Sequence, residues 1–94
     1  MYQRIVTTSA KRSLKRLPRH VREDLIRATE ILEDDPYAGE KLSGALHFLY
    51  SLHFKSQNVE YRVAYTIDHE KKLITIHFGH TRENFYEKLR RLFR

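Results

Sequence analysis

Cysteine is absent from this sequence, and glycine and proline are scarce, with three and two copies in 94 residues. Without cysteine, neither a disulfide framework nor a thiolate metal site can form. No glycine-rich loop of the type that cradles phosphate groups occurs, and no serine lies on a nucleophile elbow. His77 and His80 lack a convincing third ligand. We therefore expect no metal and no bound cofactor.

Long apolar stretches are also missing from the chain. No run approaches the roughly 20 residues that a membrane-spanning helix needs. The first twelve residues, "MYQRIVTTSAKR", lack the apolar centre of a signal peptide. These features predict a protein of the cytoplasm without a membrane partner. The length fits a single domain over residues 1–94, which can close one core but not also enclose a deep cofactor pocket.

Charge is plentiful and unevenly distributed, with a net value of +6. Residues 1–22 contain seven lysines and arginines and no acid, whereas residues 23–40 contain seven acids and one arginine. A basic protein with segregated charge suits a polyanion, most often nucleic acid, and it suits an acidic protein partner equally well. Basic helix faces are also simply solvated in many proteins, so charge alone leaves these alternatives open.

Apolar residues recur with two different periods. Val21, Leu25 and Leu32 fall on one side of a helix, whereas from residue 48 onward the period changes to two, which is typical of strands. The expected elements are a strand over 2–6, helices over 7–17 and 19–35, strands over 48–55, 60–68 and 73–80, and a helix that begins near Thr81.

This order predicts an α+β fold: a small antiparallel sheet of about four strands, an N-terminal helical hairpin and a C-terminal helix, with the helices packed on one face. The other face would be partly open. In the strand over 73–80, alternation places Ile74, Ile76 and Phe78 on the apolar side and Thr75 and His77 on the polar side.

Basic side chains and histidines on an open sheet face can cleave RNA without a metal ion. The reaction needs a base for the 2′-OH, an acid for the leaving 5′-oxygen, and cations for the charge that develops on the phosphate. Histidine ionises near neutral pH, arginine binds phosphate in a bidentate manner, and an aromatic ring stacks on an unpaired base. The candidates for these tasks are His53, Lys55, Arg62, His80, Arg82 and Tyr86.

The candidates also have ordinary structural interpretations. His53 could be a solvated strand histidine, and Arg62 could pair across strands with Glu60 or Asp68. Tyr86 could have no role other than covering the apolar stripe of the last helix. The sequence leaves both kinds of interpretation open.

Three segments taken in order, "KLSG", "LYSLHFKSQNVEYRVAYTID" and "LITIHFGHTRENFYEKLRR", resemble the RelE/ParE superfamily of type II toxin–antitoxin toxins. The resemblance covers nearly the whole chain. It implies a compact sheet with an N-terminal helical hairpin, and an antitoxin that wraps and silences the toxin. RelE-like members cut mRNA in the ribosomal A site, in contact with ribosomal RNA, whereas ParE-like members poison DNA gyrase without cutting RNA.

The resemblance also implies roles for single residues. Arg62, in "EYRVAY", matches a strand arginine that contacts phosphate, and Tyr86 matches an aromatic residue associated with base stacking or phosphate positioning. Arg82 falls near a second functional arginine, with a spacing to Tyr86 that differs by one residue. Ser51 and His53 stand where RelE-like members have a pair of lysines.

Two hypotheses follow. The first is a ribosome-dependent mRNA endoribonuclease that inhibits translation, in which His53 or Lys55 is the base and His80 the acid. Arg62, Arg82 and Tyr86 would then hold the phosphate and a base. The second is a ParE-like toxin acting on DNA gyrase, or a catalytically degenerate binding protein of the same fold. The absent lysine pair favours the second hypothesis, and the retained arginines and tyrosine favour the first.

Overall fold

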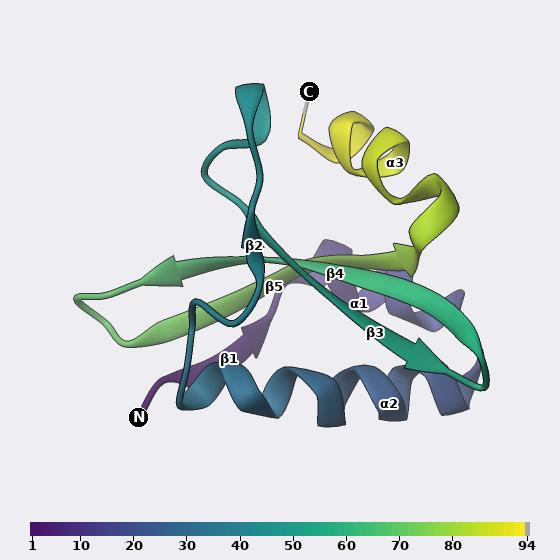
Figure 1. Cartoon of the computed structure of the whole chain (residues 1–94), viewed down its shortest axis with the longest axis horizontal. Helices are drawn as coiled ribbons and strands as arrows, with labels where there is room; N and C mark the ends of the chain where they lie inside the picture. The colour runs from purple at the N-terminus through teal and green to yellow at the C-terminus, as the bar shows by residue number, and fades with distance from the viewer. Residues whose placement is uncertain (94) are drawn as a thin grey trace.

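The computed structural model describes residues 1–93, which form one sheet flanked by helices (Figure 1). No helix within this range has the length and apolar character that crossing a membrane requires. The strands are β1 (Gln3–Val6), β2 (Glu40–Lys41), β3 (Tyr50–Ser56), β4 (Val59–Asp68) and β5 (Leu73–Thr81). The α-helices are α1 (Thr8–Lys15), α2 (Arg19–Thr29) and α3 (Phe85–Leu92), and the short 3₁₀ helices are η1 (Glu30–Glu33), η2 (Gly44–Leu46) and η3 (Arg82–Asn84).

The predicted α+β class is confirmed, although the sheet is mixed and has five strands in the order β1-β5-β4-β3-β2. Tight antiparallel pairing joins β3, β4 and β5, and the β3–β4 turn uses positive φ angles of 49° and 68° at Gln57 and Asn58. The edge strand β1 runs parallel to β5, from Gln3 opposite Leu73 to Val6 opposite Ile76. Sequence periodicity does not report this pairing, because it joins residues about 70 positions apart.

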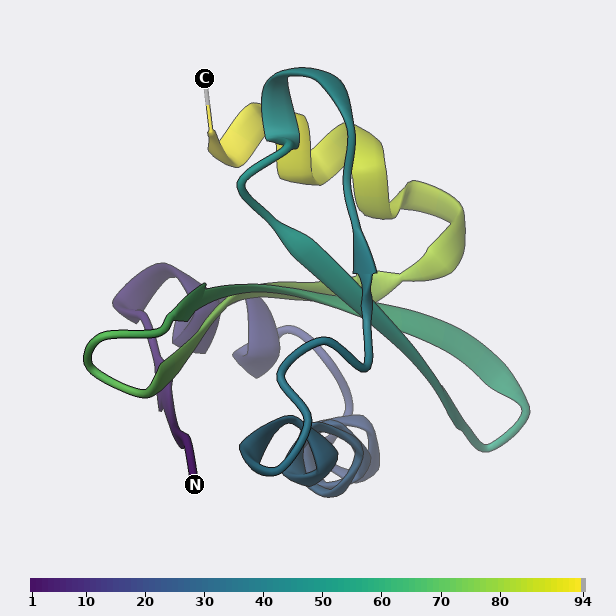
Figure 2. The same cartoon turned by 60° about the vertical axis from the view of Figure 1, so that its left-hand side comes forward.

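The helices lie on both faces of the sheet, so the expectation that all of them share one face is wrong for α3. Figure 2 shows α1 and α2 on one side and α3, with the segment around η2, on the other. Each side has its own apolar core. The first contains Ala10, Leu25, Leu32, Val63, Tyr65, Ile74 and Ile76, and the second contains Leu46, Leu49, Ala64, Phe78, Phe85 and Leu89.

A bulge in β5 creates the second core. Tyr65 pairs with Ile76 but Ala64 pairs with Phe78, so His77 is an extra residue in the ladder. A bulge of this kind reverses the alternation of side chains beyond it. The predicted shared side of Ile74, Ile76 and Phe78 is therefore wrong at Phe78, which lies in the second core. The same shift places His80 on the α3 face of the sheet.

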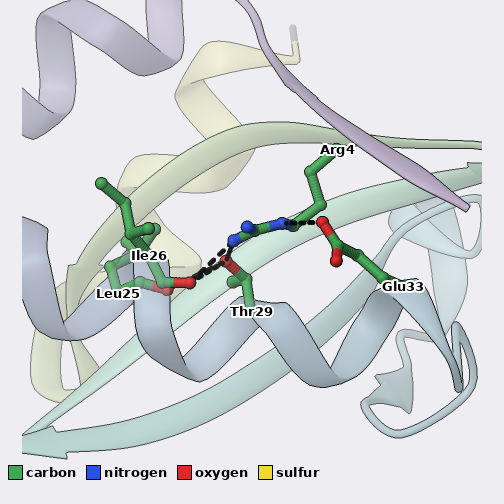
Figure 3. A network of polar contacts seen from close by, with 5 residues as sticks. All are labelled: Arg4, Leu25, Ile26, Thr29 and Glu33. Atoms are coloured by element: carbon green, nitrogen blue, oxygen red, sulfur yellow. Dashed lines mark hydrogen bonds and ion pairs between the residues drawn. The ribbon is translucent and has the colours of Figure 1, made fainter.

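Arg4 ties β1 to α2 and η1 (Figure 3). Its Nε donates to Glu33 at 2.9 Å, and its Nη1 donates to the Ile26 carbonyl at 2.7 Å and to the Thr29 hydroxyl at 2.9 Å. The Thr29 hydroxyl in turn donates to the Leu25 carbonyl at 2.9 Å. The helix expected over 19–35 changes to 3₁₀ geometry after Thr29, at this network. One of the N-terminal basic residues, Arg4, therefore stabilises the fold.

Candidate functional site

Three neighbouring strands present polar side chains on the α3 face. His53 of β3 pairs with Arg62 of β4, and Arg62 pairs with His80 of β5, so the three residues form one cross-strand row. Side chains paired in this way have Cβ atoms about 4.5 to 5.5 Å apart. In the next row Lys55 lies opposite Glu60. We call the surface formed by His53, Lys55, Glu60, Arg62, His80, Arg82 and Tyr86 the site face.

Arg62 lies at the centre of the site face. Its Nη1 donates to the fully buried Ser51 hydroxyl at 3.3 Å, and its Cζ lies 5.7 Å from the centre of the Tyr86 ring. Its Nε is enclosed and has no hydrogen-bond partner among residues 1–93. Buried donors are nearly always paired in folded proteins, so an enclosed unpaired donor calls for an explanation.

No acid within the described chain forms an ion pair with Arg62. The two acids considered from the sequence have other partners. Glu60 binds Arg82, and the Asp68 carboxylate accepts hydrogen bonds from the backbone of the β4–β5 turn. The Arg62 guanidinium thus contacts a neutral hydroxyl and an aromatic ring, and neither neutralises its positive charge. That charge remains available to an anion.

Glu60 is the site residue whose position the sequence did not reveal. Its carboxylate accepts a hydrogen bond from Arg82 Nη1 at 2.7 Å, across 22 residues of chain. The hydrogen bond and charge of Arg82 hold the pKa of Glu60 below its usual value, with smaller contributions from Lys55 and His53. The only available sequence signal was the alternation that puts Glu60 on the same strand face as Arg62. This carboxylate partly neutralises one end of the site face.

The two histidines of the central row differ in environment. His53 is exposed, whereas His80 is partly buried and stacks on Phe78, with ring centres 5.9 Å apart and planes at 8°. Burial lowers the pKa of His80. A hydrogen bond with Thr81 acts in the opposite direction, and the positive charge of Lys88 lowers the pKa further. His80 is therefore mainly neutral at pH 7, and its protonated form is a stronger acid than a free imidazolium.

Tyr86 packs against the last helix's apolar core, as the structural interpretation predicted, and it also contacts Arg62. It is half-buried, packs edge-on against Phe85 at 5.1 Å with planes at 82°, and borders the second core. The same ring covers the Arg62 guanidinium. All six residues expected from the sequence thus lie on one surface. No group of three or more metal-ligating side chains within residues 1–93 could hold a metal ion.

Burial of two histidines predicts a pH-dependent stability. Desolvation lowers the folded-state pKa of both His77 and His80 below 6.5. The unfolded chain therefore binds more protons, so the free energy of unfolding is highest above pH 6.5 and falls as the pH drops through the folded-state values. Urea denaturation at pH 7.5 and pH 5.0 should give a lower midpoint at pH 5.0. A smaller drop is expected in His77→Gln, and an equal drop would contradict this cause.

A sheet with an N-terminal helical hairpin and a cationic face under the last helix is the arrangement expected for the RelE/ParE superfamily, and comparisons with known proteins agree. The family model described as "ParE-like toxin of type II bacterial toxin-antitoxin system" matches residues 5–90. This chain therefore belongs to that family, within the RelE/ParE superfamily. A search of curated proteins found no significant match.

Solved structures share the fold. The toxin–antitoxin complex RelBE2 from Mycobacterium tuberculosis is 26% identical, with a TM-score of 0.76 over 86% of this chain and 98% of that one. The isolated E. coli RelE toxin is 20% identical, with a TM-score of 0.68 over 98% and 99% of the two chains. The archaeal RelE–RelB complex from Pyrococcus horikoshii OT3 is 23% identical, with a TM-score of 0.62 over 86% and 94%.

Proposed function

We propose that this toxin is a metal-independent endoribonuclease that cleaves mRNA in the ribosomal A site and so inhibits translation in the cytoplasm, with residues 1–94 acting as one domain. The observation that carries the proposal is the row of His53, Arg62 and His80, in which the central arginine has no acidic partner among the described residues. Two groups able to transfer protons thus flank a cation suited to phosphate.

The proposed reaction is transesterification within the RNA. His53 or Lys55 removes the proton of the 2′-OH, and the 2′-oxygen attacks the adjacent phosphorus. The bond from phosphorus to the 5′-oxygen breaks, and His80 in its protonated form donates a proton to that oxygen. The products are a 2′,3′-cyclic phosphate and a 5′-OH. Arg62 stabilises the charge that builds on the phosphate oxygens, and Tyr86 stacks on a neighbouring base.

Ser51 supports the assignment of proton transfer to the histidines. It stands where RelE-like toxins have one of two lysines, and it is fully buried with its hydroxyl bound to Arg62. A buried hydroxyl in this position orients the arginine and reaches no substrate. The proton transfers are then left to the exposed His53 or Lys55 and to His80.

A second candidate function is the poisoning of DNA gyrase, favoured by the missing amines at positions 51 and 53. Induction of the toxin in bacteria, followed by incorporation of labelled methionine and thymidine, separates the two. Protein synthesis that stops before DNA synthesis supports the ribonuclease. DNA synthesis that stops first supports gyrase as the target and rejects the ribonuclease.

We also propose an antitoxin protein as the partner of this chain. Two of the three structural relatives described above are toxin–antitoxin complexes. The site face is cationic and partly open, and coverage by an antitoxin would keep RNA from reaching Arg62. Co-expression with the antitoxin should restore growth and protect the toxin's site face from chemical modification.

Replacement of Glu60 by glutamine is expected to strengthen RNA binding. The change removes the acid that neutralises Arg82, so one more cation can contact phosphate. We expect Kd for a non-cleavable RNA oligomer to fall about threefold at low salt, measured by fluorescence anisotropy. Glu30→Gln changes the net charge equally at an exposed position of η1, on the opposite side of the sheet, and serves as the control. Equal effects of both variants would reject a local role for Glu60.

A further inference from the structure

A second basic surface lies beside the site face, along the outer edge of β5. Pairing with β1 ends at Ile76, so the rest of β5 forms no ladder on this side. The helices α1 and α3 flank this open edge and enclose a cleft of about 400 Å³. Its lining includes Arg12, Arg16, Phe78, Lys88, Arg91 and Leu92. We call this feature the basic cleft.

The charge of the basic cleft has one sign. Four cations line it and no acid does. Arg91 pairs with Glu87 at 2.8 Å, whereas Arg12, Arg16 and Lys88 form no ion pair within residues 1–93, and all three are exposed. The cavity on the other side of α1 differs, because Glu23 and Glu33 contribute to its lining. An unbalanced cationic cleft of this kind suits a polyanion.

The basic cleft adjoins the site face through Phe78 and His80. Phe78 lines the cleft, and its ring stacks on the His80 ring, with centres 5.9 Å apart. Lys88 also lines the cleft and is close enough to His80 to act on its charge. A strand that leaves the site face past His80 would therefore enter the cleft. Its phosphates would meet the cations, and its sugars would meet the apolar side chains of Phe78 and Leu92.

We infer that the basic cleft binds the phosphate backbone of the RNA strand that flanks the cleaved bond. The inference rests on the proposed ribonuclease function and extends it to the substrate outside the cleaved nucleotide pair. In the proposed reaction His80 protonates the leaving 5′-oxygen, which belongs to the nucleotide on the 3′ side of the cut. The cleft beside His80 therefore takes the strand 3′ of the cut.

Two double variants of α1 provide a matched test. Arg12→Ala with Arg16→Ala removes two cations from the basic cleft. Lys11→Ala with Lys15→Ala removes two exposed cations from the adjacent face of the same helix, which lines a different cavity. Both reduce the net charge by two, and neither touches the site face. The probe is an RNA oligomer with 2′-O-methyl groups at the cleavage position, and its binding is followed by fluorescence anisotropy at several salt concentrations.

We expect the Arg12 and Arg16 variant to weaken binding about tenfold and to lower the salt slope by about 1.4, since each phosphate contact on a single strand contributes roughly 0.7. The loss should vanish with an oligomer shortened on the 3′ side of the cut and persist with one shortened on the 5′ side. The lysine variant should retain the wild-type slope.

Three results would overturn the inference. The two double variants could weaken RNA binding equally, neither could weaken it, or the loss of affinity could depend on the length of RNA on the 5′ side of the cut. Loss of antitoxin affinity with unchanged RNA binding would overturn it in favour of a protein partner. The outcome is separate from the proposed function, because the probe cannot be cut. A wild-type protein that cuts no RNA, but whose Arg12 and Arg16 variant alone binds RNA more weakly, would reject the ribonuclease and keep the cleft as an RNA-binding surface.

Discussion

Replacement of Arg62 by alanine is expected to slow mRNA cleavage on the ribosome by at least about 100-fold, the usual cost of removing a group that stabilises transition-state charge. Arg62 is the central residue of the site face, and no acid among the described residues neutralises it. Among the described residues, no second arginine lies in the same row to replace it. Cleavage would be measured as the single-turnover rate on ribosomes programmed with a defined mRNA.

Two further variants separate catalysis from folding. Arg62→Lys keeps the charge but loses the planar guanidinium, so we expect a rate between those of the wild type and the alanine variant. Arg27→Ala removes an exposed arginine on α2 that pairs with Asp24, and it should leave the rate unchanged. Thermal denaturation checks that each variant is folded. A folded Arg62→Ala protein with near-wild-type cleavage would remove Arg62 from the mechanism.

The largest expected effect on stability comes from Gly39→Ala, at about 3 kcal/mol or more. A Cβ at this position would lie 2.6 Å from the Ser51 carbonyl oxygen and 2.6 Å from the Tyr65 hydroxyl. That hydroxyl makes two hydrogen bonds: it accepts from the Gly39 N–H at 3.0 Å and donates to the Pro36 carbonyl at 2.8 Å. The expected cost combines overpacking, about 1 to 3 kcal/mol, with strain on these hydrogen bonds.

Tyr65 leaves little room for adjustment around Gly39. Its side chain is fully buried, and burial raises the pKa of its hydroxyl to about 12, although the Gly39 hydrogen bond acts in the opposite direction. The clash also affects the site, because Ser51 is the residue that binds Arg62. We therefore expect Gly39→Ala to lower the cleavage rate as well as the free energy of unfolding.

Gly44→Ala provides the matched control for chemical denaturation. Gly44 has a φ of +67°, and apart from its chain neighbours no atom lies within 4 Å of the position that a Cβ would take, so only backbone strain opposes the substitution. That strain costs about 1 kcal/mol. If Gly39→Ala and Gly44→Ala lower the free energy of unfolding by similar amounts, then Ser51 and Tyr65 move to accommodate the added methyl group, which would contradict the expected clash.

Local patterns made most of the fold predictable. The helical hairpin and the three consecutive strands follow from apolar periods of 3.6 and 2, because each depends only on near neighbours in the chain. The parallel β1–β5 pair and the position of α3 depend on distant segments, and the sequence carried no sign of either. The bulge at His77 was also missed, because the only nearby signal is Gly79, two residues beyond it, which does not identify the extra residue.

The sequence predicted candidate residues for the site but not their arrangement in space. Histidine, arginine and tyrosine were chosen for the chemistry that RNA cleavage needs, and the β3–β4 turn alone made Arg62 a neighbour of His53 or Lys55. Strict alternation, however, would have placed His80 with Ile74 and Ile76, facing α1 and α2. Only the bulge brings His80 to the row of Arg62. The Glu60–Arg82 pair depends on the same register and was missed for that reason.

The most direct test of the ribonuclease proposal is the chemistry of the RNA ends. Purified toxin would be added to ribosomes translating a defined mRNA, the cut sites mapped by primer extension, and the new ends identified. The proposal predicts cuts spaced by codons, with 2′,3′-cyclic phosphate and 5′-OH ends, and none with Arg62→Ala. The proposal would be contradicted if the wild-type protein left the mRNA intact and instead blocked supercoiling by DNA gyrase.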